Sequence, residues 1–270
     1  MIGPAVSESA GSKAPAANAI VRNRLWREFD QFVTARADRF AVPAAKTLSA
    51  EGYRAASEYE KAGAAAAIVA VHEDDWLAYV GKVWISTAPD AAEVVEPYFA
   101  LAKARIPADI LTRAAALWVR ENGAREAEEI TKTSRRNISN QIRIGVEKRE
   151  TPQQIADRIR KHYKSVSPAR AATIARTEVH AAANFGSLAA AAEQREPMRK
   201  MWVATPDNIT RDAHVEMNGQ TKLLGDPFTH EGEKLMFPGD SSLGAPAELV
   251  VNCRCTMFYE RVRRPRRPAA

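Results

Sequence analysis

Through the first half of the chain, hydrophobic residues recur at the three- and four-residue spacing of an amphipathic helix. The clearest stretch carries Leu25, Phe29, Phe32 and Val33, with Arg, Glu and Asp between them. This pattern predicts helices over residues 20–40, 48–72, 74–85, 90–104 and 109–129. We expect Pro43, Pro89 and Pro107 to separate these helices, because proline lacks the N–H that a helix interior needs.

The next segment carries sharper helix signals. Ile138, Ile142 and Val146 lie four residues apart and predict one buried helix face. Thr151-Pro152-Gln153-Gln154 is typical of a helix start, since Thr151 can cap the helix and Gln154 can complete a capping box. Ser167-Pro168 should open another helix in the same way, which continues to about residue 195.

After Pro197 the pattern changes from helical to alternating. Residues 200–204 predict a strand, and residues 205–248 are rich in Gly, Pro, Asp and Asn. Residues 249–251 and 256–259 predict either a final pair of strands or one interrupted strand. The sequence therefore predicts an α+β fold, with a mainly α-helical N-terminal part followed by a small α+β C-terminal domain with a few short strands.

We divide the chain into four parts. Residues 1–18, rich in Ala, Ser, Gly and Pro, should form a disordered N-terminal segment, and residues 19–130 a helical domain. Residues 131–260 should form the C-terminal domain, and residues 261–270 a tail of Arg and Pro. Such a 270-residue chain with 46% hydrophobic residues can bury a substantial core, and its 7% aromatic content suits closely packed helices.

The charge is moderately basic and concentrated at the C-terminus. The net charge is +6, and the sequence pI is about 9.4. The tail contains Arg261, Arg263, Arg264, Arg266 and Arg267. This cationic segment can contact nucleic-acid phosphates without sequence specificity, or it can simply favour solubility.

The chain does not resemble a secreted or membrane protein. Its only cysteines, Cys253 and Cys255, are separated by one residue, a poor geometry for a disulfide. The N-terminus lacks the continuous apolar region of a signal peptide, and the most apolar run, residues 62–71, is about half a membrane span. We expect no segment to cross a bilayer.

Three residues are candidate metal ligands. His214, Cys253 and Cys255 offer one imidazole and two thiols, whereas zinc takes four ligands in a tetrahedron. The fourth could come from Asp212, His230 or Asp240. The alternative is that the cysteines pack as small hydrophobic residues and the histidine is hydrogen-bonded.

Other singled-out residues favour architecture over catalysis. Arg176 and Glu178 lie two apart on a predicted helix, so each should reach a different partner, and one of them could bind the segment 211–214. Glu178 as a general base near His214 is the catalytic alternative. Trp202 should anchor the core, while Asn218-Gly219 and Asn252 should form turns.

The chain lacks the sequence signatures of several large enzyme classes. It has no phosphate-binding Gly-x4-Gly-Lys loop, no dinucleotide-binding Gly-x-Gly-x-x-Gly, no Gly-x-Ser-x-Gly nucleophile elbow and no His-Glu-x-x-His. We therefore predict a protein that is not an enzyme and that has no catalytic residues.

The second half of the chain resembles the phage head morphogenesis family, the Mu F-like minor head proteins, from about residue 134 to residue 259. The resemblance depends on the order of the residues Arg176, Glu178, Asn184, Trp202, Asp207, Arg211, His214, Gly219, Pro246, Asn252, Cys253 and Cys255, with Phe237-Pro238-Gly239 among them.

The resemblance implies a structural minor capsid protein of a tailed phage or prophage. Such a protein acts in procapsid assembly at the portal and the inner head, in the host cytoplasm and then in the virion. The implied partners are the portal protein and the major capsid or scaffold protein, with double-stranded DNA as a partner of some members. The resemblance implies no membrane and no required cofactor. Two alternatives stay open: a zinc-dependent enzyme or toxin-associated module centred on His214, Cys253 and Cys255, and a non-specific DNA-binding protein.

Overall fold

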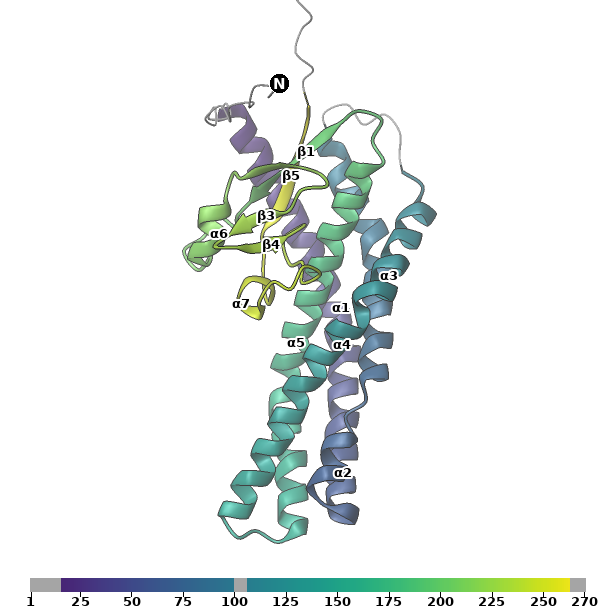
Figure 1. The fold of residues 1–270 in the computed structure, drawn as a ribbon, viewed down its shortest axis with the longest axis vertical. Helices are drawn as coiled ribbons and strands as arrows, with labels where there is room; N and C mark the ends of the chain where they lie inside the picture. Colours follow the sequence, from purple (N-terminus) through teal and green to yellow (C-terminus); the bar gives the residue numbers. More distant parts are fainter. Residues whose placement is uncertain (1–15, 100–105, 263–270) are drawn as a thin grey trace, which may run out of the picture.

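Long helices dominate the computed structural model, which describes residues 16–99 and 106–262 (Figure 1). The helices of the elongated bundle are α1 (Ala16–Ala62), α3 (Glu73–Val95), α4 (Ala108–Glu147) and α5 (Pro152–Ala192). A short α2 (Ala64–Val69) connects α1 to α3, and the 3-10 helix η1 (Glu96–Tyr98) follows α3. Helices α1 and α5 share the most extensive contact in the bundle.

A small α+β unit packs against the side of α1 and α5 near one end of the bundle (Figure 1). Its elements are β1 (Met198–Val203), α6 (Asp212–Met217), β2 (Thr221–Leu223), β3 (Phe228–His230), β4 (Glu233–Leu235), α7 (Ala247–Val250) and β5 (Thr256–Arg261). The strands form an antiparallel sheet of order β2-β1-β5 and a separate β3-β4 hairpin. The predicted α+β class, helical first and then α+β, is confirmed.

The predicted domain limits fall differently on these elements. The division between residues 130 and 131 lies inside α4, and the bundle contains helices from both sides of it. Arg261 ends β5, whereas Arg263, Arg264, Arg266 and Arg267 lie outside the described residues, as do residues 1–15 of the expected disordered segment.

The prediction that Pro43 and Pro89 break the helices was wrong, because both lie inside continuous helices, α1 and α3. In each case a side chain of the neighbouring helix donates to the backbone carbonyl three residues before the proline. The Tyr79 hydroxyl of α3 donates to the Phe40 carbonyl of α1 at 3.2 Å. The Arg36 guanidinium of α1 donates to the Ser86 carbonyl of α3 and also pairs with Asp90 at 2.6 Å. These tertiary contacts stabilise the two helices within one turn of each proline.

Two other local predictions were also wrong. Pro168 lies within α5, so Ser167 does not open a separate helix; packing along α1 outweighs the local preference. Residues 249–251 do not form a strand: residues 247–250 form α7, in which Leu249 N–H donates to the Pro246 carbonyl at 2.9 Å. A short apolar run does not distinguish a strand from a buried helical turn.

Other predictions were confirmed in detail. The capping box at the start of α5 is complete, with Gln154 N–H donating to the Thr151 hydroxyl at 3.3 Å and the reciprocal bond at 2.7 Å. Ile138 and Ile142 are buried as expected, although Val146 is exposed.

Among the helices that the structure describes, none has the length and apolar character that crossing a membrane requires.

An aromatic cluster joins the bundle to the α+β unit. The Trp84 ring of α3 stacks on Trp118 of α4, with centroids 3.4 Å apart and planes at 7°. Phe185 of α5 and Phe237, which follows β4, pack against Trp84 at centroid distances of 5.6 and 6.4 Å. The core therefore continues from the helices into the second unit.

We predict that Gly186→Ala destabilises the fold, because α5 and α3 pack backbone to backbone at this position. A Cβ on Gly186 would lie 2.1 Å from the Ala88 carbonyl oxygen, so one helix must move. The expected loss in free energy of unfolding is about 1–3 kcal/mol or more, measured by urea denaturation. Gly225→Ala is the matched control, since a Cβ there meets nothing within 4 Å. Equal stability of the two variants would contradict a close approach of the two helices.

Candidate functional site

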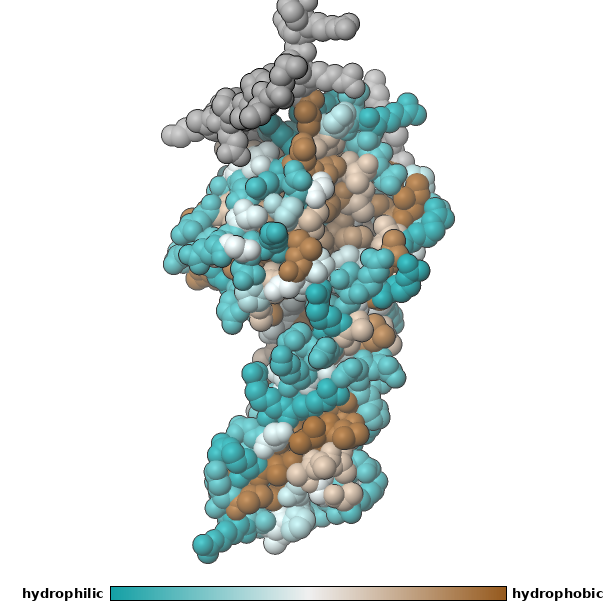
Figure 2. Space-filling view, in the orientation of Figure 1, coloured by the Kyte–Doolittle hydropathy of each residue, from teal (hydrophilic) through white to brown (hydrophobic). Residues whose placement is uncertain are grey.

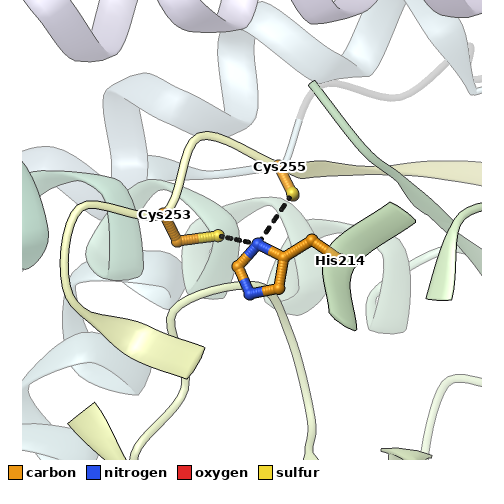
Figure 3. A group of neighbouring side chains, drawn as sticks. All are labelled: His214, Cys253 and Cys255. Atoms are coloured by element: carbon orange, nitrogen blue, oxygen red, sulfur yellow. Dashed lines mark hydrogen bonds between the residues drawn. The ribbon is translucent and has the colours of Figure 1, made fainter. Parts of the chain in front are cut away.

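The structure brings His214, Cys253 and Cys255 together in a buried cluster (Figure 3). His214 lies on α6, and the cysteines lie on the turn between α7 and β5. The Nδ1 atom of His214 is 3.7 Å from Cys253 Sγ and 3.4 Å from Cys255 Sγ. All three candidate ligand atoms lie within 4.8 Å of one another.

A backbone carbonyl sets the orientation of the imidazole. His214 Nε2 lies 3.1 Å from the Leu249 carbonyl oxygen, which can only accept a hydrogen bond. Nε2 must therefore carry the hydrogen, and when the ring is neutral the lone pair of Nδ1 faces both sulfurs. Trp202, fully buried in β1, packs against the ring at a centroid distance of 5.6 Å, as expected of a core anchor.

Side chains of α1 and α5 hold the backbone of the Cys-x-Cys turn. Trp26 Nε1 of α1 donates to the Arg254 carbonyl at 3.0 Å. The Thr177 hydroxyl of α5 accepts from Asn252 N–H at 3.2 Å. Asn252 adopts a left-handed backbone with φ 56°, a conformation that asparagine tolerates better than most residues. The turn is therefore fixed from two helices.

The Cys255 carbonyl is held from α5 alone. His180 Nε2 and Asn184 Nδ2 both donate to it, at 2.6 and 3.2 Å. Burial lowers the pKa of His180 to about 3, so its imidazole is neutral near pH 7. Both donors come from the buried face of α5, which thereby positions the second cysteine.

The two thiols differ in acidity. Burial raises the pKa of Cys253 well above its usual value. The pKa of Cys255 is lowered, mainly by a hydrogen bond from the Cys253 thiol and to a smaller extent by His214. Cys255 is therefore the thiol that ionises first.

A pocket of about 300 Å³ opens beside the cluster, and His214 and Cys255 form part of its wall. Three arginines also line this pocket. Arg176 pairs with Asp30 of α1 at 3.1 Å, and Arg254 pairs with Asp207 at 2.7 Å. Arg211 donates to the Val251 carbonyl at 2.5 Å and forms no ion pair within the described part of the chain. Arg211 is therefore the arginine that gives the pocket wall a positive charge not balanced by an ion pair among the described residues.

The proposed fourth ligands lie apart from the cluster. Asp212 is exposed, and His230 faces Glu216 at 3.5 Å. The carboxylate of Asp240 accepts from Met236 N–H at 2.7 Å and from Ser242 N–H at 2.8 Å, so both oxygens are engaged in a turn. Within residues 16–99 and 106–262, no further Asp, Glu, His or Cys joins the three ligands.

Arg176 and Glu178 reach different partners, but neither binds the segment 211–214 through a hydrogen bond. The charge-assisted bond of Arg176 goes to Asp30. Glu178 is buried and accepts from Trp84 Nε1 at 3.0 Å. Burial, together with repulsion from Glu126, raises the pKa of Glu178 to about 8. Glu178 is therefore mostly protonated near pH 7 and serves the bundle core rather than the cluster.

The other motif residues form turns. Asp207 accepts from the Thr210 hydroxyl at 2.9 Å, and its bond to Arg254 lowers the pKa of its carboxyl group. Gly219 has φ 82°, a left-handed conformation that glycine adopts without steric cost. These residues shape the walls of the site.

The sequence analysis missed several supporting residues. Trp26 and His180 carried no motif that separated them from ordinary core residues, and Thr177 lies in the motif between Arg176 and Glu178 but was given no role of its own. Lys200 was assigned only to a strand, yet its buried Nζ donates to the Leu224 and Met236 carbonyls at 3.0 and 2.6 Å. Burial lowers the pKa of Lys200 to about 8. A charged residue within an apolar strand was the one available signal.

Comparison with known proteins agrees with the resemblance seen in the sequence. Residues 136–258 match the model of the family described as phage Mu protein F like protein. No curated protein and no solved structure gives a significant match. The matched region includes α5, the α+β unit as far as the middle of β5, and all three residues of the cluster.

We predict that Glu178→Gln flattens the pH dependence of stability between about pH 4.5 and pH 8. The folded state holds a proton on Glu178 up to about pH 8, whereas an unfolded carboxyl group releases it near 4.5. Stability contributed by the protonated group is therefore complete below pH 4.5 and is lost as the pH rises through about 8. Each unit of pKa shift corresponds to about 1.4 kcal/mol.

Urea denaturation at pH 5 and pH 8 measures this effect. Glutamine keeps an oxygen for Trp84 Nε1 but does not titrate. Glu121→Gln is the control, because the Glu121 side chain is 60% exposed. Parallel pH profiles for the wild type and Glu178→Gln would contradict the assignment.

Proposed function

We propose that the chain is a structural minor head protein, because residues 136–258 match the model of the phage Mu protein F like family, which suggests a phage head morphogenesis protein. It acts in procapsid assembly at the portal and inner shell of a tailed phage or prophage. It resides in the host cytoplasm during assembly and in the virion afterwards. The family match is the observation that carries this proposal.

The architecture supports a protein that connects other components. The matched region contributes α5 and the last part of α4 to the bundle, while α1 and α3 come from outside it. Helix α1 packs along α5 and also binds the Cys-x-Cys turn through Trp26. The N-terminal helices are thus packed firmly against the matched region, and together they form an elongated arm that can reach another protein.

The distal end of this arm offers a contact surface. It is the end formed by α2 and the turn between α4 and α5, far from the α+β unit (Figure 1). Tyr53, Val69 and Val146, near this end, are 66%, 73% and 61% exposed. Figure 2 shows hydrophobic surface on the distal part of the bundle. Exposed apolar residues favour burial against a partner, and we assign this end to the portal or the major capsid or scaffold protein.

We predict that deleting the gene yields heads that assemble or package poorly and that wild-type protein supplied in trans restores infectious particles. Quantitative mass spectrometry of purified precursor and mature heads should find a few to tens of copies, scaled to the portal and the major shell protein.

The double variant Tyr53→Lys/Val69→Lys should fold normally but be depleted from heads, because it places charge on the distal end.

Leu223→Lys is the matched control, since Leu223 is 55% exposed on β2 of the other unit. Its incorporation should equal that of the wild type. Absence of the wild-type protein from both precursor and mature heads would overturn the proposed function. Normal incorporation of the double variant would overturn only the assignment of the distal end.

Contact with double-stranded DNA is a further part of the proposal, based on the arginines of the C-terminal tail. A chain ending at Val262 keeps β5 and removes Arg263, Arg264, Arg266 and Arg267. DNA affinity should fall, and the slope of log affinity against log salt should decrease by about 0.9 for each phosphate that the shortened chain no longer neutralises. Fluorescence anisotropy with a duplex of arbitrary sequence at several salt concentrations measures both quantities. Unchanged affinity and slope would exclude the tail as a DNA-binding segment.

A further inference from the structure

We propose that His214, Cys253 and Cys255 bind one Zn²⁺ ion, with the fourth coordination position open to the pocket lined by Arg176, Arg211 and Arg254. The proposal is independent of the role in head assembly. It concerns three buried side chains from two segments of the chain: Cys253 and Cys255 follow His214 by 39 and 41 residues.

The distances fit the metal. Tetrahedral zinc with Zn–N near 2.0–2.1 Å and Zn–S near 2.3 Å places nitrogen and sulfur ligands about 3.6 Å apart. The two Nδ1–Sγ distances are 3.7 and 3.4 Å, on either side of that value. Both nitrogen–sulfur distances are therefore already close to those around a bound zinc ion.

The surroundings prepare these groups as ligands. The bond between His214 Nε2–H and the Leu249 carbonyl directs Nδ1 toward the sulfurs, the arrangement common to zinc-bound histidines. The Cys255 carbonyl is held by His180 and Asn184, which limits movement of its thiol. Simple packing of two small hydrophobic side chains would not require this alignment.

The charges also balance. Binding releases one proton from each thiol, and the two thiolates then neutralise the doubly charged ion beside a neutral imidazole. A buried site with no net charge avoids most of the cost of transferring charge from water.

The fourth position depends on the pocket. Cys255 and His214 line it, and no fourth protein ligand lies nearby among the described residues. A water molecule can complete the tetrahedron from this side. The guanidinium of Arg211, which forms no ion pair within the described residues, favours replacement of that water by an anion such as phosphate.

Metal analysis of the untagged full-length chain tests the proposal. After incubation with zinc and removal of free metal, we expect one zinc per chain by elemental mass spectrometry. Cobalt substitution should give the visible spectrum of a tetrahedral ion with two thiolates. Cys253→Ser, Cys255→Ser and His214→Gln should each lower zinc affinity by more than the about 10–100-fold that loss of a supporting hydrogen bond costs.

His230→Gln is the control, because His230 lies outside the cluster and should leave binding unchanged. If the ligand variants fail to fold, cobalt titration of the unmodified chain still decides the matter. Absence of stoichiometric metal in the folded wild type, a disulfide between the cysteines, or full zinc retention by folded cysteine variants would overturn the proposal.

Inorganic phosphate tests the open position. Added to the cobalt-loaded chain, it should change the visible spectrum, and Arg211→Ala should weaken that response by several-fold. A spectrum that phosphate does not alter would overturn the replacement of water by an anion at the fourth position.

Discussion

The arrangement of the site depends on the hydrogen bonds that α5 makes to the Cys255 carbonyl. This carbonyl is buried, and a buried acceptor without a partner costs about 1–3 kcal/mol. His180 and Asn184, one turn apart on α5, both donate to it. Because the same helix also binds Asn252 through Thr177, the Cys-x-Cys turn has one position relative to the bundle. Loss of these hydrogen bonds would leave Cys253 and Cys255 less firmly positioned, with the bond from Trp26 of α1 to the Arg254 carbonyl still present.

The buried polar face of α5 also connects the site to the helical core. Glu178 lies two residues before His180 and accepts from Trp84, which stacks on Trp118. A protonated carboxyl group in this position avoids the cost of a buried charge near neutral pH. The close approach of Gly186 to the Ala88 backbone holds α5 against α3 further along. One helix thus carries side chains for the core and for the site.

This arrangement joins the matched residues 136–258 to the N-terminal helices through side-chain contacts. The matched residues 136–258 begin inside α4, and α1 contributes Trp26 and Asp30 to the surroundings of the pocket. The arm and the α+β unit are therefore joined through side-chain contacts as well as through the chain.

The helical periodicity, the capping box at Thr151 and the order of the family motif could all be predicted from the sequence, because each is a local pattern. His214, Cys253 and Cys255 could also be identified there, since their residue types suit a metal. The continuation of helices through Pro43, Pro89 and Pro168 could not be predicted, because contacts from other helices decide it. Nor could the sequence show that the Asp240 carboxylate is hydrogen-bonded within its own turn. It also could not show that His180 donates to the Cys255 carbonyl, 75 residues later in the chain. Folding in three dimensions brings such groups together, since hydrogen bonding depends on distance in space rather than in sequence.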